Sequence, residues 1–399
     1  MLRLLYIIII LMAYIPPLKA EKEMPIIAYW GVPDTMSNES RFREFSECGF
    51  TVSIYPYWQL ETLVKACRKA NKYGVKIIGR CPEMKNNPTA IANILSKEQG
   101  FMGYFIQDEP NVPEIRQRQK EIKRLQHVDS AHIFYINLLP FIQADWVEPS
   151  VKVKTYPEYL RAASSTSCNQ ISFDFYPITT AGVHPSWYHN LEMVRSESLA
   201  SGKPFWGFAL SVPHNVPNVP DTYYPTPNMA MLRLQIYSNL AYGAQAIQYF
   251  TYWTPTPTKD YNFHDAPISR DGKKTKTYAV VQKMNRELRV VSRLFYGAKV
   301  TSVRHLGGAL PEGTSRQNTM PVNLKQLKVV SAKGAIISLL NKEGKQYMAI
   351  VNKDPQRAMT VLIEKKNDTP RHVTKELKEE AMKQRYVVPA GDVLLFMLK

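Results

Sequence analysis

Short apolar runs alternate with longer amphipathic segments along the first three quarters of the chain. The apolar runs have the length of strands buried on both faces, and they occupy residues 26–31, 50–57, 75–80, 101–107, 132–138, 170–176, 204–211 and 244–251. The segments between them have the spacing of helices, and they begin near residues 39, 58, 88, 112, 155, 186, 228 and 274. Glycine, a frequent helix stop, closely precedes several of the next strands, at Gly49, Gly74, Gly100, Gly202 and Gly243.

Repeats of this kind match a (β/α)8 TIM barrel in number and order. The rival architecture is a doubly wound open sheet, which commonly carries a glycine-rich phosphate loop after its first strand. Residues 29–34 (Tyr-Trp-Gly-Val-Pro-Asp) contain no such loop. We therefore predict an α/β fold with a TIM barrel over residues 21–296.

The last hundred residues have a different pattern. Short β-type runs occupy residues 334–340, 346–352, 359–364, 386–389 and 392–397, with turn residues between them. A helix is conceivable only at residues 375–383. The pattern predicts a small antiparallel β-sandwich over residues 297–399. It contains no evident catalytic cluster, so we expect a packing domain rather than a sugar-binding module.

The first twenty residues have the pattern of a secretory signal peptide. A basic start at Arg3 precedes an apolar stretch from Leu4 to Ile15, which is too short to span a bilayer. Cleavage after Ala20 would leave a secreted or periplasmic protein with no stable membrane insertion. An uncleaved amino-terminal anchor is the alternative.

The chain is basic, with 51 lysines and arginines against 34 aspartates and glutamates. Residues 297–399 hold 18 basic and 9 acidic residues, so 18 − 9 = +9 of the net +17 lies there. Such a surface attracts anionic glycans, acidic lipids or nucleic acid. No nucleic-acid-binding motif accompanies it, and we interpret it as a solvated surface.

The four cysteines, Cys48, Cys67, Cys81 and Cys168, show no paired spacing. We expect mostly buried free thiols. No set of histidines and acids has the spacing of metal ligands, so neither a metal site nor another cofactor is expected.

The segment Gly-Tyr-Phe-Ile-Gln-Asp-Glu-Pro at residues 103–110 carries the strongest chemical signal. An apolar run ends in two acids, Asp108 and Glu109, and Pro110 stops the strand because proline donates no ladder hydrogen bond. The acids therefore lie at the carboxyl end of a barrel strand, where active sites are built. The alternative is a solvated acidic turn.

Polar and aromatic residues collect at the other strand ends as well. Rings stack on sugar faces, and carboxylates and amides bind hydroxyl groups, so the combination predicts a carbohydrate partner. The candidate substrate-binding residues are Trp30, Tyr55, Tyr57, Asp108, Asn137, Tyr176, His214, Tyr249, Tyr252 and Trp253. Each is also compatible with a structural role, and Arg80 and Glu83 are expected to form a salt bridge.

The residues resemble a clan A glycoside hydrolase, in particular secreted or periplasmic proteins of gut Bacteroidetes. In that clan the general acid lies at the end of the fourth strand in Asn-Glu-Pro, which Asp108-Glu109-Pro110 matches with Asp in place of Asn. The resemblance implies that Glu109 is the acid/base and that Asp108 touches the sugar 2-hydroxyl. Tyr252 and Trp253 resemble the clan's aromatic platform, and residues 268–275 are similar as well.

The chain departs from the clan at the seventh strand. The clan's nucleophile is a glutamate there, whereas residues 208–213 are Phe-Ala-Leu-Ser-Val-Pro. Two carboxylates are needed for the common hydrolytic routes, and Asp174 at the sixth strand is the best second candidate, ahead of Glu83 and Asp221. Because strands four and six are not adjacent, we expect a wide separation and favour inversion. The alternatives are a non-catalytic carbohydrate-binding protein and a lyase or transglycosidase.

Overall fold

The structure is a computed structural model that describes residues 23–399. The predicted signal peptide at residues 1–20 lies outside this range. Within residues 23–399, no helix is long and apolar enough to cross a membrane.

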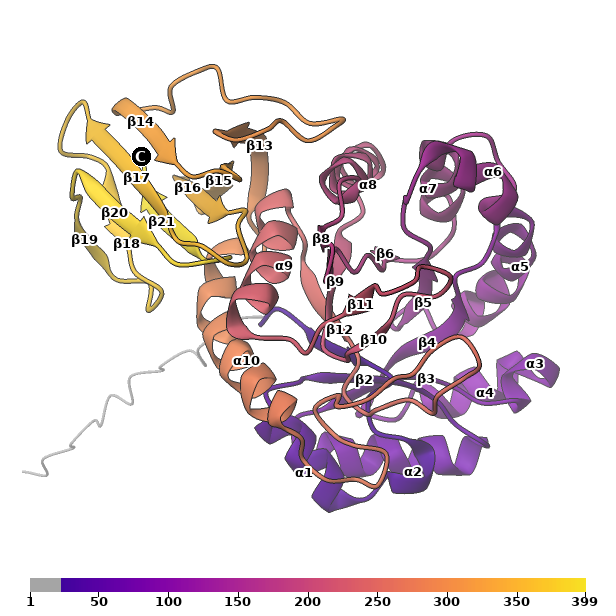
Figure 1. Cartoon of the computed structure of the whole chain (residues 1–399). Coiled ribbons are helices and arrows are strands. Elements are labelled where there is room, and N and C mark those ends of the chain that lie inside the picture. The colour runs from indigo at the N-terminus through magenta and orange to yellow at the C-terminus, as the bar shows by residue number, and fades with distance from the viewer. Residues whose placement is uncertain (1–22) are drawn as a thin grey trace, which may run out of the picture.

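Eight parallel strands close into a barrel, as predicted (Figure 1). Each lies within one of the predicted strands, except that β4 extends one residue further: β1 (Ile26–Tyr29), β2 (Val52–Pro56), β3 (Lys76–Arg80), β4 (Phe101–Asp108), β5 (Ile133–Leu138), β6 (Ile171–Phe173), β9 (Phe205–Leu210) and β12 (Ala246–Phe250). The barrel closes where β1 pairs with β12. The fold is therefore a (β/α)8 TIM barrel.

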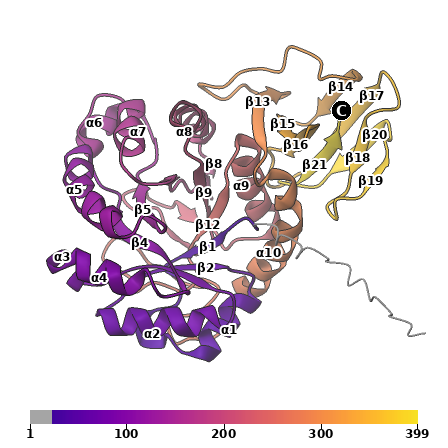
Figure 2. The same ribbon diagram turned by 180° about the vertical axis from the view of Figure 1, so that it is seen from behind.

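The predicted helices surround the barrel (Figure 2), and each begins within two residues of its predicted start. They are α1 (Glu39–Glu47), α2 (Leu60–Asn71), α4 (Pro88–Leu95), α5 (Val112–Val128), α7 (Tyr156–Ser164), α8 (Trp187–Ser201), α9 (Met229–Tyr242) and α10 (Lys276–Phe295). Short elements that the sequence pattern did not reveal are η1 (Asp34–Met36), α3 (Glu83–Asn86), α6 (Ala144–Val151), β7 (Ile178–Thr179), β8 (Gly182–Val183), β10 (His214–Asn215) and β11 (Tyr223–Tyr224).

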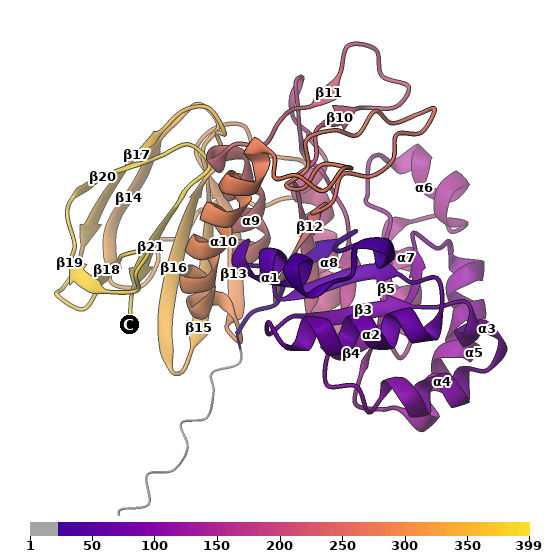
Figure 3. The same ribbon diagram turned by 90° about the horizontal axis from the view of Figure 1, so that it is seen from below.

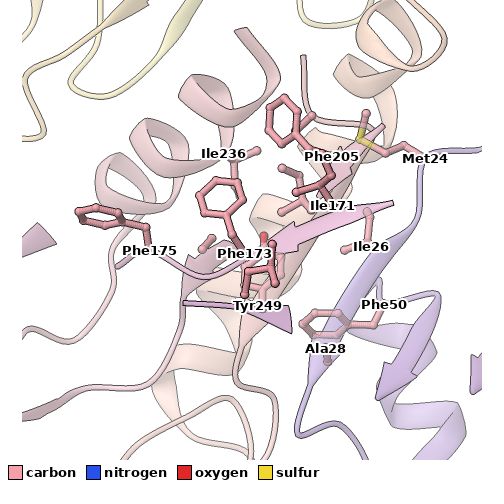
Figure 4. Close-up of a cluster of buried hydrophobic side chains, with 14 of the residues drawn as sticks. Met24, Ile26, Ala28, Phe50, Ile171, Phe173, Phe175, Phe205, Ile236 and Tyr249 are labelled. Carbon is pink, nitrogen blue, oxygen red and sulfur yellow. The ribbon is translucent and has the colours of Figure 1, made fainter. Parts of the chain in front are cut away.

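Side chains alternate between the two faces of the barrel wall, because successive strand residues point to opposite sides. Ile27 and Tyr29 of β1 belong to the cluster that fills the barrel interior, whereas Ile26 and Ala28 belong to the outer layer. Figure 4 shows part of that outer layer, which includes Tyr249 of β12 and Ile236 of α9. The residues on either side of an interior residue in a strand thus face the helices.

Residues 299–397 form two antiparallel sheets. The larger contains β13 (Lys299–Leu306), β15 (Ala335–Lys342), β16 (Lys345–Asn352), β21 (Val393–Met397), β18 (Arg371–Val373) and β19 (Glu379–Ala381), in that order. The smaller contains β14 (Leu324–Val330), β17 (Met359–Lys365) and β20 (Arg385–Val388). A separate hydrophobic core that includes Ile337 and Phe396 lies between them, so the predicted β-sandwich is confirmed.

The prediction of a possible helix at residues 375–383 is wrong. Residues 374–378 form a tight turn in which the Thr374 N–H donates to the Lys378 carbonyl, and Glu379–Ala381 then pair with β18 as an edge strand. The helix-forming glutamates and lysines of this segment are largely exposed, so pairing with β18 outweighs their local preference.

The β-sandwich lies beside α9 and α10 (Figure 3). Alternate residues of its larger sheet, such as Ile336 and Val351, join the same hydrophobic cluster as the outer layer of the barrel. The Ser338 hydroxyl also donates a 2.7 Å hydrogen bond to the Ala241 carbonyl of α9. The central strands β15 and β16 of the larger sheet are therefore largely buried on both faces.

Candidate active site

The ends of β4 and β6 are tied to consecutive carbonyl groups of β5, which lies between them. The Glu109 N–H donates to the Asn137 carbonyl at 2.8 Å, and the Asp174 N–H donates to the Leu138 carbonyl at 3.3 Å. This register brings both carboxyl groups to the same level at the carboxyl end of the barrel. They are near enough for each carboxyl group to influence the pKa of the other.

The local sequence explains how Glu109 is presented. Its backbone has φ of 45°, a left-handed conformation that is strained for a residue with a side chain. The strand ends there, and α5 begins at Val112 behind a capping box formed by Asn111 and Glu114. A fixed strand end and a well-capped helix thus hold a strained residue in place.

Ionisation of this carboxyl pair is costly. Asp108 and Glu109 are in contact with solvent, and Asp174 is half-buried, yet protein closely surrounds all three. Burial first, and the charge of Asp108 second, raise the pKa of Glu109 to about 7. Burial, followed by the charges of Glu109 and Asp108, also raises the pKa of Asp174 well above its ordinary value. At neutral pH the pair therefore retains a proton.

The separation of the Glu109 and Asp174 carboxyl groups bears on the stereochemical outcome, and the wide separation expected from the sequence stays a prediction. The two groups influence each other's pKa across β5, although their strands are not neighbours. Inversion calls for about 6.5–9.5 Å between the two carboxyl groups, and retention for about 5–5.5 Å. The mutual effect of the two groups on their pKa values sets neither spacing, so inversion stays a prediction.

Asp108 is held from behind by Asn137. The Asn137 side-chain N–H donates to the Asp108 carboxylate at 3.2 Å, and Asn137 is only 1% exposed. Burial raises the pKa of Asp108, while the nearby Tyr29 hydroxyl, the hydrogen bond from Asn137 and the charge of Arg80 partly oppose the increase. Asn137 therefore lies behind Asp108 as its hydrogen-bond partner, and its predicted contact with substrate stays a prediction.

Three of the predicted aromatic residues remain partly exposed at this end of the barrel. Trp30 and Tyr55 pack edge to face with their ring centres 5.1 Å apart. Tyr176 stacks on Phe250 at 5.5 Å, and its hydroxyl donates to Asp174 at 3.2 Å. These rings are the ones that fit the predicted stacking role.

The other predicted substrate contacts are buried, which argues against direct binding by them. Tyr249 and Tyr252 face outward and pack against Phe50 of the outer layer. The His214 ring lies against Tyr224, and burial lowers the pKa of His214 to about 4. The buried members of the predicted set, besides Asn137, are Tyr57, His214, Tyr249, Tyr252 and Trp253.

The weaker catalytic candidates have structural surroundings. Glu83 accepts a hydrogen bond from the Leu60 N–H at the start of α2, and this bond is the main cause of its lowered pKa. The predicted Arg80–Glu83 salt bridge is absent, because the Arg80 guanidinium lies 4.9 Å from the Phe105 ring centre. Asp221 is exposed in the connection between β10 and β11. At the end of β9, Ser211 is buried and donates to the Thr251 carbonyl at 2.7 Å.

Two polar residues near the site, Ser172 and Gln248, were not predicted as site residues from the sequence. Ser172 and Gln248 are fully buried, and they hydrogen-bond to each other at 2.8 Å inside the barrel. The signal that could have identified them is the strand alternation, because Ser172 shares its strand face with Asp174. Buried polar side chains on the inner face need partners there.

No group of three or more histidine, cysteine or acidic residues that could hold a metal ion occurs in residues 23–399. All four cysteines are buried free thiols, as predicted for most of them, and burial raises the pKa of each. Their raised pKa values do not favour a nucleophilic thiolate.

Comparison with known proteins gives the fold a context. The profile of glycoside hydrolase family 42, described as beta-galactosidase, matches residues 133–291, less than half of the chain. This region includes Asp174 but not Glu109. A search of curated proteins finds no match.

Solved structures resemble the chain more completely. The beta-galactosidase from Bacillus circulans sp. alkalophilus has a TM-score of 0.61 at 10% identity, with 94% of this chain and 99% of that chain covered. The chain has the fold of a clan A-like glycoside hydrolase. A family 5 glycoside hydrolase from Bacteroides vulgatus has a TM-score of 0.57 at 11% identity, with 94% and 88% covered. The chain spans 60% of a Marinomonas beta-galactosidase, with 68% of this chain covered, 10% identity and a TM-score of 0.51. These identities establish a likeness of fold.

Proposed function

We propose that this chain is a glycoside hydrolase in which Glu109 is the general acid and Asp174 is the second carboxylate. The observation that carries the proposal is that Glu109 and Asp174 are bonded to consecutive carbonyl groups of β5 at the carboxyl end of a clan A-like barrel, with the pKa of Glu109 raised to about 7. A general acid works best when its pKa lies near the operating pH.

The chemistry follows from the positions of the groups. Glu109 donates its proton to the glycosidic oxygen as the bond to the anomeric carbon breaks, and Asp174 then activates the water or stabilises the positive charge that develops on the sugar. Asp108 accepts a hydrogen bond from a sugar hydroxyl, and Trp30 and Tyr55 offer ring surfaces to the sugar. Inversion would require about 6.5–9.5 Å between the Glu109 and Asp174 carboxyl groups, and retention about 5–5.5 Å.

A second function is favoured by one specific observation. Ser211 occupies the end of β9, where the clan places its nucleophile, and its hydroxyl is already engaged with a backbone carbonyl. A barrel that has lost this carboxylate is suited to binding a glycan without cleaving it.

The test is release of reducing sugar from a panel of glycosides and polysaccharides by wild type, Glu109→Gln and Asp174→Asn. Glu61→Gln is the matched control, because Glu61 is exposed on α2 and pairs only with Lys65. We expect losses of about 10²–10⁴-fold in the first variant and activity close to wild type in the control. Absence of turnover by wild type, together with glycan binding by all four proteins, would reject the hydrolase in favour of the binder.

We also propose that the chain is exported, because residues 1–20 have the pattern of a signal peptide. The amino terminus of protein recovered from the periplasm or medium is then expected at Glu21. Recovery of full-length chain in the cytoplasm alone would reject export.

A further inference from the structure

A set of buried polar side chains crosses the barrel interior from β12 to the catalytic end of β4. We name it the interior array, and it consists of Tyr135, Asn137, Ser172 and Gln248, each at most 1% exposed. The hydrogen bonds among these four side chains show which group they hold in place.

The direction of each hydrogen bond follows from the chemistry of the groups. The Tyr135 hydroxyl donates to the Gln248 side-chain oxygen at 2.7 Å, since that oxygen can only accept. The Gln248 side-chain N–H donates to the Ser172 hydroxyl oxygen at 2.8 Å. Gln248 is thereby fixed in one orientation, with its oxygen toward Tyr135 and its nitrogen toward Ser172.

Ser172 in turn determines the orientation of the Asn137 side-chain amide. Its hydroxyl lies 3.0 Å from the Asn137 side-chain oxygen and 3.1 Å from the Tyr135 oxygen. The Tyr135 proton is already committed to Gln248, so the Ser172 proton is available to the amide oxygen of Asn137. The amide N–H of Asn137 then points away from Ser172 and donates to Asp108 at 3.2 Å.

We propose that the interior array is a positioning device that locks the Asn137 amide with its N–H toward Asp108 and so keeps Asp108 an ionised hydrogen-bond acceptor. The inference rests on the proposed function, in which ionised Asp108 binds a sugar hydroxyl beside Glu109. A reversed Asn137 amide would turn its oxygen toward the carboxylate and favour protonation of Asp108 instead.

Other groups also affect the ionisation of Asp108, and the effect of the interior array adds to theirs. The titratable and charged groups facing it are Tyr29 on β1, Arg80 on β3, the adjacent Glu109, Tyr135 on β5, Tyr159 on α7, and Asp174 and Tyr176 after β6. Arg80 favours the ionised form of Asp108, whereas the charges of Glu109 and Asp174 oppose it. Asn137 is the neutral donor whose direction the array determines.

The direct test is the titration of the Asp108 carboxyl carbon by NMR in protein labelled at aspartate side-chain carboxyl groups, with the resonance identified by its loss in Asp108→Asn. We expect the titration of Asp108 to move to higher pH in Ser172→Ala and further in Asn137→Ala, because each weakens the donor to the charged form. Ser53→Ala is the matched control, since Ser53 is a fully buried strand serine that bonds the Val32 backbone N–H at 3.1 Å.

The kinetic counterpart is the pH profile of kcat/KM. At pH 5 we expect about a tenfold loss in Ser172→Ala relative to wild type, with little loss at pH 7, whereas Ser53→Ala has the wild-type profile. An Asp108 titration that stays at its wild-type position in both Ser172→Ala and Asn137→Ala would overturn the proposal. If wild type cleaves no glycoside, the proposed function fails, but the NMR titration still decides on the interior array.

Discussion

Glu109 owes its raised pKa to two separable causes, burial and the neighbouring charge of Asp108. The proton donor is lost as the pH rises through the pKa of Glu109, so kcat/KM should fall above about pH 7. Asp108→Asn restores the clan's Asn-Glu-Pro and removes the second cause. We expect its alkaline limb to move to lower pH while staying above the ordinary pKa of a glutamate, about 4.3. An alkaline limb at the wild-type position in Asp108→Asn would show that the charge of Asp108 does not reach Glu109.

Ionised Asp174 should lower the free energy of unfolding at the pH at which the proposed reaction takes place. Its folded-state pKa is raised above the unfolded value of about 3.9. The stability linked to its protonated form is therefore fully present below about pH 4 and is lost as the pH rises through the folded-state pKa. Asp174→Asn removes this loss, so its thermal midpoint should exceed that of wild type at pH 8, and the difference should disappear near pH 4. A variant less stable than wild type at pH 8 would contradict the raised pKa.

At the same scale, the sequence was sufficient for some site residues and not for others. Asp108 and Glu109 could be placed because Pro110 fixes the strand end, and Asp174 because a charge in an apolar strand needs a partner. The placement of Tyr249 was wrong because a run of consecutive aromatic residues at a strand end hides which of them face inward. The roles of Asn137 and Ser172 depend on contacts between different strands, and no local pattern reports those.

At the level of elements, helix ends that looked alike in sequence have different physical causes. Gly74 has φ of 70° and open space around it, whereas Gly100 has no such φ, and a Cβ there would lie 2.6 Å from the Cys67 carbonyl carbon of α2. Gly74→Asn should cost less than about 1 kcal/mol in unfolding free energy, because asparagine tolerates the left-handed conformation. Gly100→Ala should cost about 1–3 kcal/mol through overpacking against a backbone that cannot move.

Chemical denaturation of the two glycine variants measures the difference. Equal losses of unfolding free energy would mean that conformation, rather than space, determines both positions.

The elements themselves followed from the sequence in the barrel and less fully in the β-sandwich. Barrel strands are continuous apolar runs flanked by amphipathic helices, so both the type and the order of elements are visible. β13 and β14 were missed because each has a solvent-facing side on which lysines and other polar residues interrupt the apolar pattern. The segment at residues 375–383 has helical composition, and only its pairing with β18 makes part of it a strand.

At the scale of the whole molecule, a cluster of four charges joins the barrel to the β-sandwich. Glu287 of α10 binds Arg233 of α9 at 2.5 Å and Lys375 at 2.8 Å, and Asp392 binds both cations. Burial alone would raise the pKa of Glu287, but the hydrogen bonds from Arg233 and Lys375 lower it to about 2. The cluster is only slightly exposed, so its charges interact strongly.

Glu287→Gln should therefore lower the unfolding free energy at pH 7 by about 1–3 kcal/mol, less than for a fully buried pair. Because the folded-state pKa is depressed, this contribution is present above about pH 4.3 and is lost as the pH falls toward 2. Denaturant titrations at pH 7 and pH 3 should thus show a smaller difference at pH 3. The control is Glu364→Gln, which breaks an exposed pair with Lys325 and should have no measurable effect at either pH. An equal loss of unfolding free energy in both variants would show that the cluster does not stabilise the junction between the domains.

The central claim, that Glu109 is the proton donor to a leaving group, is tested most directly by varying that leaving group. The measurement is kcat/KM of wild type and Glu109→Gln for one sugar attached either to a second sugar, which needs protonation to depart, or to a dinitrophenyl group, which does not. We predict a loss of about 10²–10⁴-fold for the disaccharide and a far smaller loss for the dinitrophenyl glycoside. Equal losses for both substrates, or no loss for the disaccharide, would contradict the assignment of Glu109.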